Sequence, residues 1–369
     1  MQDQELDFGG RMLHRSKRKR VVIVDDSRSI RRWLRGVFEE DPRLIVVGEA
    51  SCALTARQVI RDTDPNVVTL DIDMPGMNGL EFLVKLMTLR PMPVVMISAT
   101  THQNSEVTIT ALTAGAIDCI VKPTIVPGPK GRRDMCRRVF SAACSKVITP
   151  PGITGRLSAS SLPIDDDHQM PLVLIGASTG GVNAIEHVLA GLDADGPPVV
   201  IVQHMPGAFL VSFSQLLNRN LAQNVGIARA GEVLHPGQVR LAPAQGRHTE
   251  ILCKGRQWIC RFSKQDDLSR HCPSVDVLFK SAAQYGRDII AVILTGLGRD
   301  GAEGLLQLHA GGARTIGQDQ QSCVIYGMPR AAFELGAVDL QLPPEKIGGA
   351  VNRAIAAHAE AQRIGERQE

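Results

Sequence analysis

Residues 67–83 read VVTLDIDMPGMNGLEFL, and this stretch decides the class of the fold. Its apolar, β-branched beginning is typical of a buried strand. Asp71 follows at the end of that strand, and the Pro-Gly and Asn-Gly pairs predict a turn before a helical pattern of apolar residues. A buried strand that leads through a short turn into a helix is the repeating unit of a parallel α/β sheet.

The same unit recurs on both sides of this stretch. We expect strands at residues 21–24, 44–48, 67–70, 94–98 and 118–121, which would form a five-stranded, flavodoxin-like, doubly wound sheet. A second series is expected at residues 172–175, 199–203, 225–229, 239–242, 289–294 and 314–317. A β-hairpin is expected at residues 250–253 and 257–262. The prediction is an α/β protein with two parallel sheets, the second larger, Rossmann-like and carrying the hairpin.

The chain length also favours two domains. A chain of 369 residues is too long for one ordinary hydrophobic core. Residues 144–169 are rich in Pro, Gly, Ser and Asp and lack an apolar period, which is typical of a linker. We therefore predict a first domain at residues 19–143, a linker at 144–169 and a second domain at 170–362.

Composition excludes several classes of function. Aromatic residues make up only 4% of the chain and the net charge is +3, which argues against nucleic-acid binding. No apolar run is long enough to cross a membrane, so direct membrane insertion is not expected. The eight cysteines are scattered without a Cys-x-x-Cys pair, which predicts neither a zinc site nor a disulfide framework. A cytoplasmic protein is expected. The basic run at residues 15–20 is interpreted as a solvated arm.

Carboxylates gather at the ends of the strands in the first half. Asp25 and Asp26 follow the first strand and Asp71 follows the third, and these two strands are neighbours in a 2-1-3-4-5 sheet. Three carboxylates at one point require a cation, and oxygen ligands of this kind suit Mg²⁺. Ser98 and Lys122 follow the fourth and fifth strands.

This pattern predicts a phosphoryl-transfer site in which Asp71 attacks the phosphoryl group. Asp25, Asp26 and Asp71 would hold the metal, Lys122 would contact the phosphorylated carboxylate, and Ser98 would donate a hydrogen bond to it. A plainer interpretation is that Asp25, Asp26 and Ser27 merely cap the helix that opens at Ile30. That interpretation does not account for the side chains at the other strand ends.

The motifs of this half resemble those of a response-regulator receiver domain. They are VVIVDDS at 21–27, TLDIDMPGMNGLEFL at 69–83, PVVMISA at 93–99 and AIDCIVKP at 116–123. The resemblance implies that Asp71 is the phosphoacceptor and that a histidine kinase is the phosphodonor. One position departs from the pattern, since Cys119 stands where receivers carry an aromatic switch residue.

A second set of polar residues follows the strands of the other half. Ser178 lies in a glycine-rich turn between a strand and a helix, His204 follows the next strand, and Asp300 follows the strand at 289–294. These strand ends would meet in one crevice. Ser178 would be a nucleophile, His204 its general base and Asp300 the carboxylate that orients the imidazole. Each has a plainer interpretation. Ser178 would belong to an anion-binding glycine-rich loop, His204 would be a surface histidine, and Asp300 would be the N-cap of the helix that starts at Gly301.

Two other folds share part of this pattern. A dinucleotide-binding turn needs an acidic residue at the end of the next strand, where this chain has Gln203 and His204. Residues 176–180 satisfy the Gly-x-Ser-x-Gly pattern of the α/β-hydrolases, but that fold places its triad in the order Ser, Asp, His. The order Ser, His, Asp fits neither fold. His235, His248 and His271 are interpreted as structural or surface histidines.

The second half resembles the chemotaxis protein-glutamate methylesterases. The matching stretches are IGASTGG at 175–181, PVVIVQHMP at 198–206, GEVLHPGQVRLAPAQGRH at 231–248, CPSVDVLF at 272–279, VILTGLGRDGAEGL at 292–305 and QDQQSCVIYGMPRAA at 318–332. The resemblance carries Ser178, His204 and Asp300 over as catalytic residues and makes Thr179 and the backbone near Leu297 oxyanion candidates. Leu297 itself departs from the family, which has methionine there.

The resemblance also implies what the protein does. It implies hydrolysis of glutamyl methyl esters on the cytoplasmic helices of chemoreceptors, with deamidation of receptor glutamines, in a reaction that needs no cofactor. Mg²⁺ would be needed only for phosphorylation of the receiver. In the family the unphosphorylated receiver covers the catalytic crevice. The alternative is a phosphorelay receiver fused to an inactive interaction domain.

Overall fold

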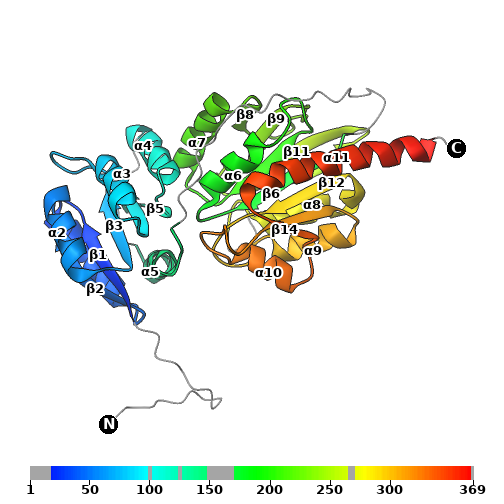
Figure 1. Ribbon diagram of the computed structural model, residues 1–369. Coiled ribbons are helices and arrows are strands. Elements are labelled where there is room, and N and C mark those ends of the chain that lie inside the picture. The colour runs from blue at the N-terminus through cyan, green and yellow to red at the C-terminus, as the bar shows by residue number, and fades with distance from the viewer. Residues whose placement is uncertain (1–17, 99–101, 124–126, 148–169, 265–270, 367–369) are drawn as a thin grey trace, which may run out of the picture.

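The structure is a computed structural model, and it describes residues 18–98, 102–123, 127–147, 170–264 and 271–366. The predicted linker lies outside the described residues from residue 148 to residue 169, as does the predicted basic arm up to residue 17. Figure 1 shows two α/β domains that lie side by side along the chain.

The N-terminal domain is a five-stranded sheet in the order β2-β1-β3-β4-β5, with every pair of neighbours parallel. Its elements are β1 (Lys19–Val24), α1 (Arg28–Glu39), β2 (Leu44–Ala50), α2 (Ala53–Thr63), β3 (Val67–Asp71), α3 (Gly79–Leu89), β4 (Val94–Ser98), α4 (His102–Thr113), β5 (Asp118–Val121) and α5 (Pro129–Ala143). The predicted flavodoxin-like order is confirmed.

The stretch at 67–83 forms the predicted strand, turn and helix. All five residues of β3 are buried, as expected for a central strand covered on both faces. Asn78 caps α3 by accepting a hydrogen bond, 2.9 Å long, from the amide of Glu81. The acidic side chain of Glu81 lies in the first helical turn, where the helix dipole favours it.

The C-terminal domain has a seven-stranded, all-parallel sheet in the order β14-β13-β12-β6-β7-β9-β8 and a separate two-stranded sheet, β10-β11. Its strands are β6 (Leu172–Ala177), β7 (Val199–Gln203), β8 (Asn224–Ile227), β9 (Gln238–Leu241), β10 (Arg247–Lys254), β11 (Gln257–Lys264), β12 (Ile289–Ile293), β13 (Arg314–Gln318) and β14 (Leu340–Leu342). The predicted class is confirmed here too. The sequence missed β14, because this strand is only three residues long and partly exposed.

Helices cover both faces of this larger sheet. They are α6 (Gly181–Ala190), α7 (Gly207–Asn220), α8 (Val275–Ala282), η1 (Ala283–Asp288), α9 (Ala302–Ala310), α10 (Met328–Glu334) and α11 (Pro344–Glu366). One apolar core joins α6, α7 and α11 to the sheet, and another joins α8, α9, α10 and the hairpin to it. Helix α11 runs past residue 362, where the sequence placed the end of the domain.

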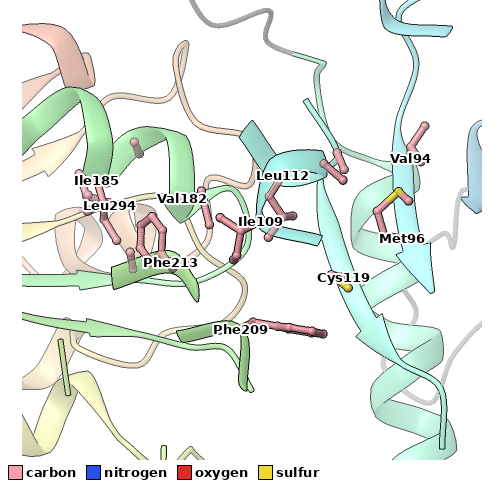
Figure 2. Close-up of a cluster of buried hydrophobic side chains, with 14 of the residues drawn as sticks. Val94, Met96, Ile109, Leu112, Cys119, Val182, Ile185, Phe209, Phe213 and Leu294 are labelled. Atoms are coloured by element: carbon pink, nitrogen blue, oxygen red, sulfur yellow. The ribbon is translucent and has the colours of Figure 1, made fainter. Parts of the chain in front are cut away.

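The two domains share an apolar contact. Ile109 and Leu112 of α4 pack toward Val182 of α6 and Phe209 of α7, and Figure 2 shows these side chains in one cluster. Ile109 and Phe209 are each only 1% exposed. Because α4 precedes β5 and α6 follows Ser178, this contact holds the N-terminal domain beside the second set of polar residues.

Across the described residues, none of the helices combines the length and apolar character that a membrane crossing requires.

Candidate functional sites: an acidic pocket and a serine cleft

The carboxylates predicted for the first site do converge. Ligand atoms of Asp25, Asp26 and Asp71 all lie within 4.8 Å of one another. Asp25 and Asp71 are each 1% exposed, whereas Asp26 faces solvent. The Lys122 ammonium lies 2.9 Å from Asp25 Oδ2 and 2.7 Å from Asp71 Oδ2. The donor set consists of hard oxygen atoms with one open side, which fits Mg²⁺.

Burial sets the electrostatics of this pocket. Burial raises the pKa of Asp71 to about 6, because the charged form loses solvation, although Lys122 opposes the shift and Asp25 adds to it. Burial would by itself lower the pKa of Lys122, but its contacts with Asp71 and Asp25 outweigh this and raise the pKa. The lysine is therefore held as a cation between two carboxylates.

The strand ends place the remaining predicted residues near this pocket. Ser98 ends β4 and is fully buried, and its carbonyl accepts a hydrogen bond, 2.7 Å long, from the Lys122 amide. The helix-capping role falls to Ser27, whose hydroxyl accepts from the amide of Ile30 at 3.5 Å. Asp25 instead accepts from the amide of Ser27 at 2.9 Å. Capping therefore does not account for the aspartate pair.

In the second domain, neighbouring strands bring Ser178 and His204 to the same edge of the sheet. Ala177 and Gln203 face each other in the parallel pair β6-β7. The two candidate residues come directly after them, and the His204 amide donates to the carbonyl of Ala177 at 3.0 Å. Gly296 allows a close approach to Ser178, because a Cβ at that glycine would lie 2.7 Å from the Cβ of Ser178.

Asp300 binds His204 and is itself firmly held. Its Oδ2 lies 2.8 Å from His204 Nε2. The carboxylate also accepts from the Ser274 hydroxyl at 2.8 Å and from the amides of Val275 and Asp276 at 2.8 and 3.1 Å. Asp300 thus caps the start of α8, whereas Gly301 is the cap residue of α9, the helix that the plainer interpretation assigned to Asp300.

These contacts fix the charge of Asp300. Burial would raise its pKa, but the hydrogen bonds from His204, Val275 and Asp276 hold the pKa well below its usual range. A carboxylate that stays ionised beside Nε2 favours the tautomer with the proton on that nitrogen. The other ring nitrogen, Nδ1, then carries a lone pair.

Ser178 lies in the same cleft as His204, and its side chain is only slightly exposed. Within the described part of the chain, no hydrogen bond joins Ser178 to His204, and His204 Nδ1 is buried without a hydrogen-bond partner. The Ser178 amide donates a hydrogen bond to the carbonyl of Thr295 at 3.0 Å, so this amide is not available as an oxyanion donor. Thr179 and Leu297, the oxyanion candidates, both line the cleft.

The sequence did not single out His271 as a site residue. Its ring stacks on the His204 ring with centroids 4.4 Å apart and planes 14° apart. Burial, together with the charge of His204, lowers the pKa of His271 to about 4. No signal in the sequence placed His271 beside His204, because the stacking joins residues far apart in the chain. His248 is buried, and its Nδ1 accepts from the Ser274 amide at 3.1 Å, which is a structural role.

The N-terminal domain also reaches the cleft. The cleft has a volume of about 1140 Å³, and helix α5 and Asp118 line one side of it. The Thr179 hydroxyl donates to Asp118 Oδ2 at 3.4 Å, and Asn183 donates to the carbonyl of Leu112 at 3.1 Å. Both domains therefore border the space around Ser178.

These features define a class, namely a phosphoacceptor-type α/β domain joined to a second α/β domain with a serine cleft. Family models match accordingly. Residues 21–126 match the response regulator receiver domain, and residues 173–351 match the CheB methylesterase.

Curated relatives extend over nearly the whole chain. The protein-glutamate methylesterase/protein-glutamine glutaminase of Agrobacterium fabrum is 45% identical over 348 residues, which is 92% of this chain and 98% of the relative. One such protein of Pseudomonas aeruginosa is 40% identical over 93% of this chain and 99% of its own. The chain belongs to the protein-glutamate methylesterase/protein-glutamine glutaminase family. The crystal structure of the Thermotoga maritima CheB methylesterase catalytic domain is 33% identical, covers 51% of this chain and 98% of its own, and gives a TM-score of 0.48.

Proposed function

We propose that this protein hydrolyses glutamate γ-methyl esters on chemoreceptors, giving glutamate and methanol, and that it also deamidates receptor glutamines. The observation that carries this proposal is the cleft in which Ser178 and His204 lie together, with Asp300 bound to His204. The names of the relatives support the same substrate class. The substrate would be the cytoplasmic helices of methyl-accepting receptors, and the output would be sensory adaptation.

The proposed reaction gives each of the three side chains one role. His204 takes the hydroxyl proton of Ser178 through Nδ1 as the Ser178 oxygen bonds to the ester carbonyl carbon. The bond to the methoxy oxygen then breaks, and methanol leaves with that proton. Water attacks the acyl-enzyme by the same route and releases the glutamate side chain. Asp300 stabilises the imidazolium in both steps, and donors near Thr179 and Leu297 would stabilise the oxyanion.

Regulation would act through the receiver. Asp71 would accept a phosphoryl group from a chemotaxis histidine kinase, with Mg²⁺ bound by Asp25, Asp26 and Asp71. Lys122 and Ser98 would contact the phosphoryl oxygens. The apolar contact of α4 with α6 and α7 holds the unphosphorylated receiver beside Ser178. Release of the receiver from this contact would open the cleft.

The decisive experiment measures methanol release from receptor membranes that carry methyl esters. We expect release by the full chain, an increase with a small phosphodonor, and loss of release in Ser178→Ala. Asp71→Asn is the matched control for regulation, since it should retain basal release but not respond to the phosphodonor. An inactive interaction domain would give no methanol with any of these proteins, provided that each is folded by circular dichroism.

A further inference from the structure

One wall of the serine cleft is supplied by the receiver and is basic. Ser178, His204 and His271 lie on the esterase side, and helix α5 contributes Arg133 and Arg137 on the other. Arg133 is exposed and Arg137 is partly exposed. The charges of these residues therefore face the space in which a substrate would lie.

The cations on this wall outnumber the acids. The charged residues that line the cleft from the receiver are Asp118, Lys130, Arg133, Asp134, Arg137 and Arg138. Arg138 binds Asp118 at 2.8 Å, and Arg137 binds Asp134 at 2.6 Å. Among the described residues, Lys130 and Arg133 have no ion-pair partner. The wall thus carries an excess of positive charge at its rim.

Within the ranges that the structure describes, the acids on the other side of Arg133 are paired with other arginines. Glu40 and Asp41 lie near it, along an adjoining depression. Glu40 is paired with Arg132 at 3.0 Å, and Asp41 is paired with Arg43 at 2.7 Å. These carboxylates are already engaged, so Arg133 keeps its charge available to the cleft.

We propose that the basic surface of α5, formed by Lys130, Arg133 and Arg137, binds acidic side chains that flank the glutamyl ester on the substrate protein. This proposal rests on the proposed esterase function. Each turnover converts a neutral ester into a carboxylate, so a receptor segment with several such glutamates carries negative charge beside the remaining esters. Complementary charge at the rim of the cleft would attract such a segment. The receiver would then attract the substrate protein to the rim of the cleft that its own release opens.

The test compares two synthetic peptides of equal length, each with one glutamyl methyl ester, flanked either by glutamates or by glutamines. Hydrolysis is measured with the full chain, with and without a phosphodonor. In the double variant Arg133→Glu/Arg137→Glu we expect kcat/KM on the acidic peptide to fall about fivefold, through KM. The value on the neutral peptide should stay within about twofold. Added salt should weaken the wild-type preference, since exposed charges are screened.

Arg57→Glu/Arg61→Glu is the matched control, because it places the same two charge reversals on α2, at the end of the receiver away from the esterase (Figure 1). It should leave the preference between the peptides unchanged. The proposal is wrong if the double variant treats both peptides as the wild type does. It is also wrong if the variant loses activity equally on both, since the arginines would then act within the protein. A wild type that hydrolyses neither peptide would instead contradict the proposed function itself, and this proposal with it.

Discussion

Asn183, in the first turn of α6, donates a hydrogen bond 3.1 Å long to the main-chain carbonyl of Leu112, near the end of α4. This bond connects the esterase to the receiver only a few residues after Ser178. Leu112 also belongs, with Ile109, to the apolar contact with Val182 and Phe209 (Figure 2). The contact is thus partly polar and can be weakened without touching the proposed catalytic residues.

Asn183→Ala should raise the activity of the unphosphorylated protein. Loss of one hydrogen bond costs the closed arrangement about 1 kcal/mol, which corresponds to an increase of roughly fivefold in the fraction of open molecules. Methanol release measured without a phosphodonor tests this. Asn352→Ala is the control, because it removes a comparable bond to the carbonyl of Gly191 that lies wholly within the esterase. An equal increase in the control would contradict the prediction.

Asp300→Asn should lower kcat by about 10³-fold or more, because the imidazolium would lose its ionised partner and the tautomer of His204 would no longer be fixed. KM should change little. Initial rates of ester hydrolysis at saturating substrate check this. Asp276→Asn is a useful comparison, since this neighbouring carboxylate accepts from the Gly304 amide and does not bind His204. Retention of near-normal kcat in Asp300→Asn would remove Asp300 from the mechanism.

His271 should make the folded protein less stable in mild acid. Its pKa is lowered by burial from 6.5 to about 4, so between these values the unfolded chain binds a proton that the folded protein does not. The contribution of His271 to the free energy of unfolding therefore falls as pH decreases from 6.5 toward 4. His271→Gln should reduce this pH dependence.

The contribution of His271 to stability is measured as the difference between the urea unfolding midpoints at neutral pH and at about pH 5. His235→Gln is the control, because His235 is an exposed histidine of the same domain. The prediction fails if the two variants lose the same amount of stability between the two pH values.

Removal of Mg²⁺ should abolish phosphorylation of the receiver but not ester hydrolysis. A chelator should prevent phosphorylation of Asp71 by a small phosphodonor, because Asp25, Asp26 and Asp71 would repel the incoming phosphoryl group without a cation. Basal ester hydrolysis should continue, since the mechanism proposed for Ser178, His204 and Asp300 uses no metal. Phosphate-affinity electrophoresis and methanol release, measured on the same samples, test both statements. A chelator that stops both reactions would place a metal in the esterase mechanism.

Much of the fold could be predicted because its signals are local. The buried strands were found from their β-branched runs, and β4, β5 and β7 have the predicted bounds. Other ends shifted by one to three residues, as at β12, which ends one residue earlier than predicted, and at β10, which begins three residues earlier. β14 was missed because an edge strand of three residues carries too little pattern.

Part of each candidate site could also be predicted from local signals. Parallel strands place their carboxyl ends along one edge, so Asp25 and Asp71, or Ser178 and His204, can be paired from strand order alone. His271 could not, because its position depends on stacking against a residue far away in the chain. The hydrogen bonds that Ser274 and the α8 amides donate to Asp300 could not be predicted either, because they form only when α8 packs beside the turn after β12.

The sequence by itself determined most strands of both sheets, the order of the first sheet around Asp71 and the side chains that follow these strands, because hydrophobic period and turn residues act over short distances. Only the tertiary structure decided which ring nitrogen of His204 meets Asp300, and that α5 of the receiver forms a wall of the serine cleft. The first relationship depends on the packing of α8 beside the turn after β12, and the second depends on the packing of α4 against α6 and α7. Such packing sums many weak contacts between distant segments, and no single stretch of sequence encodes it.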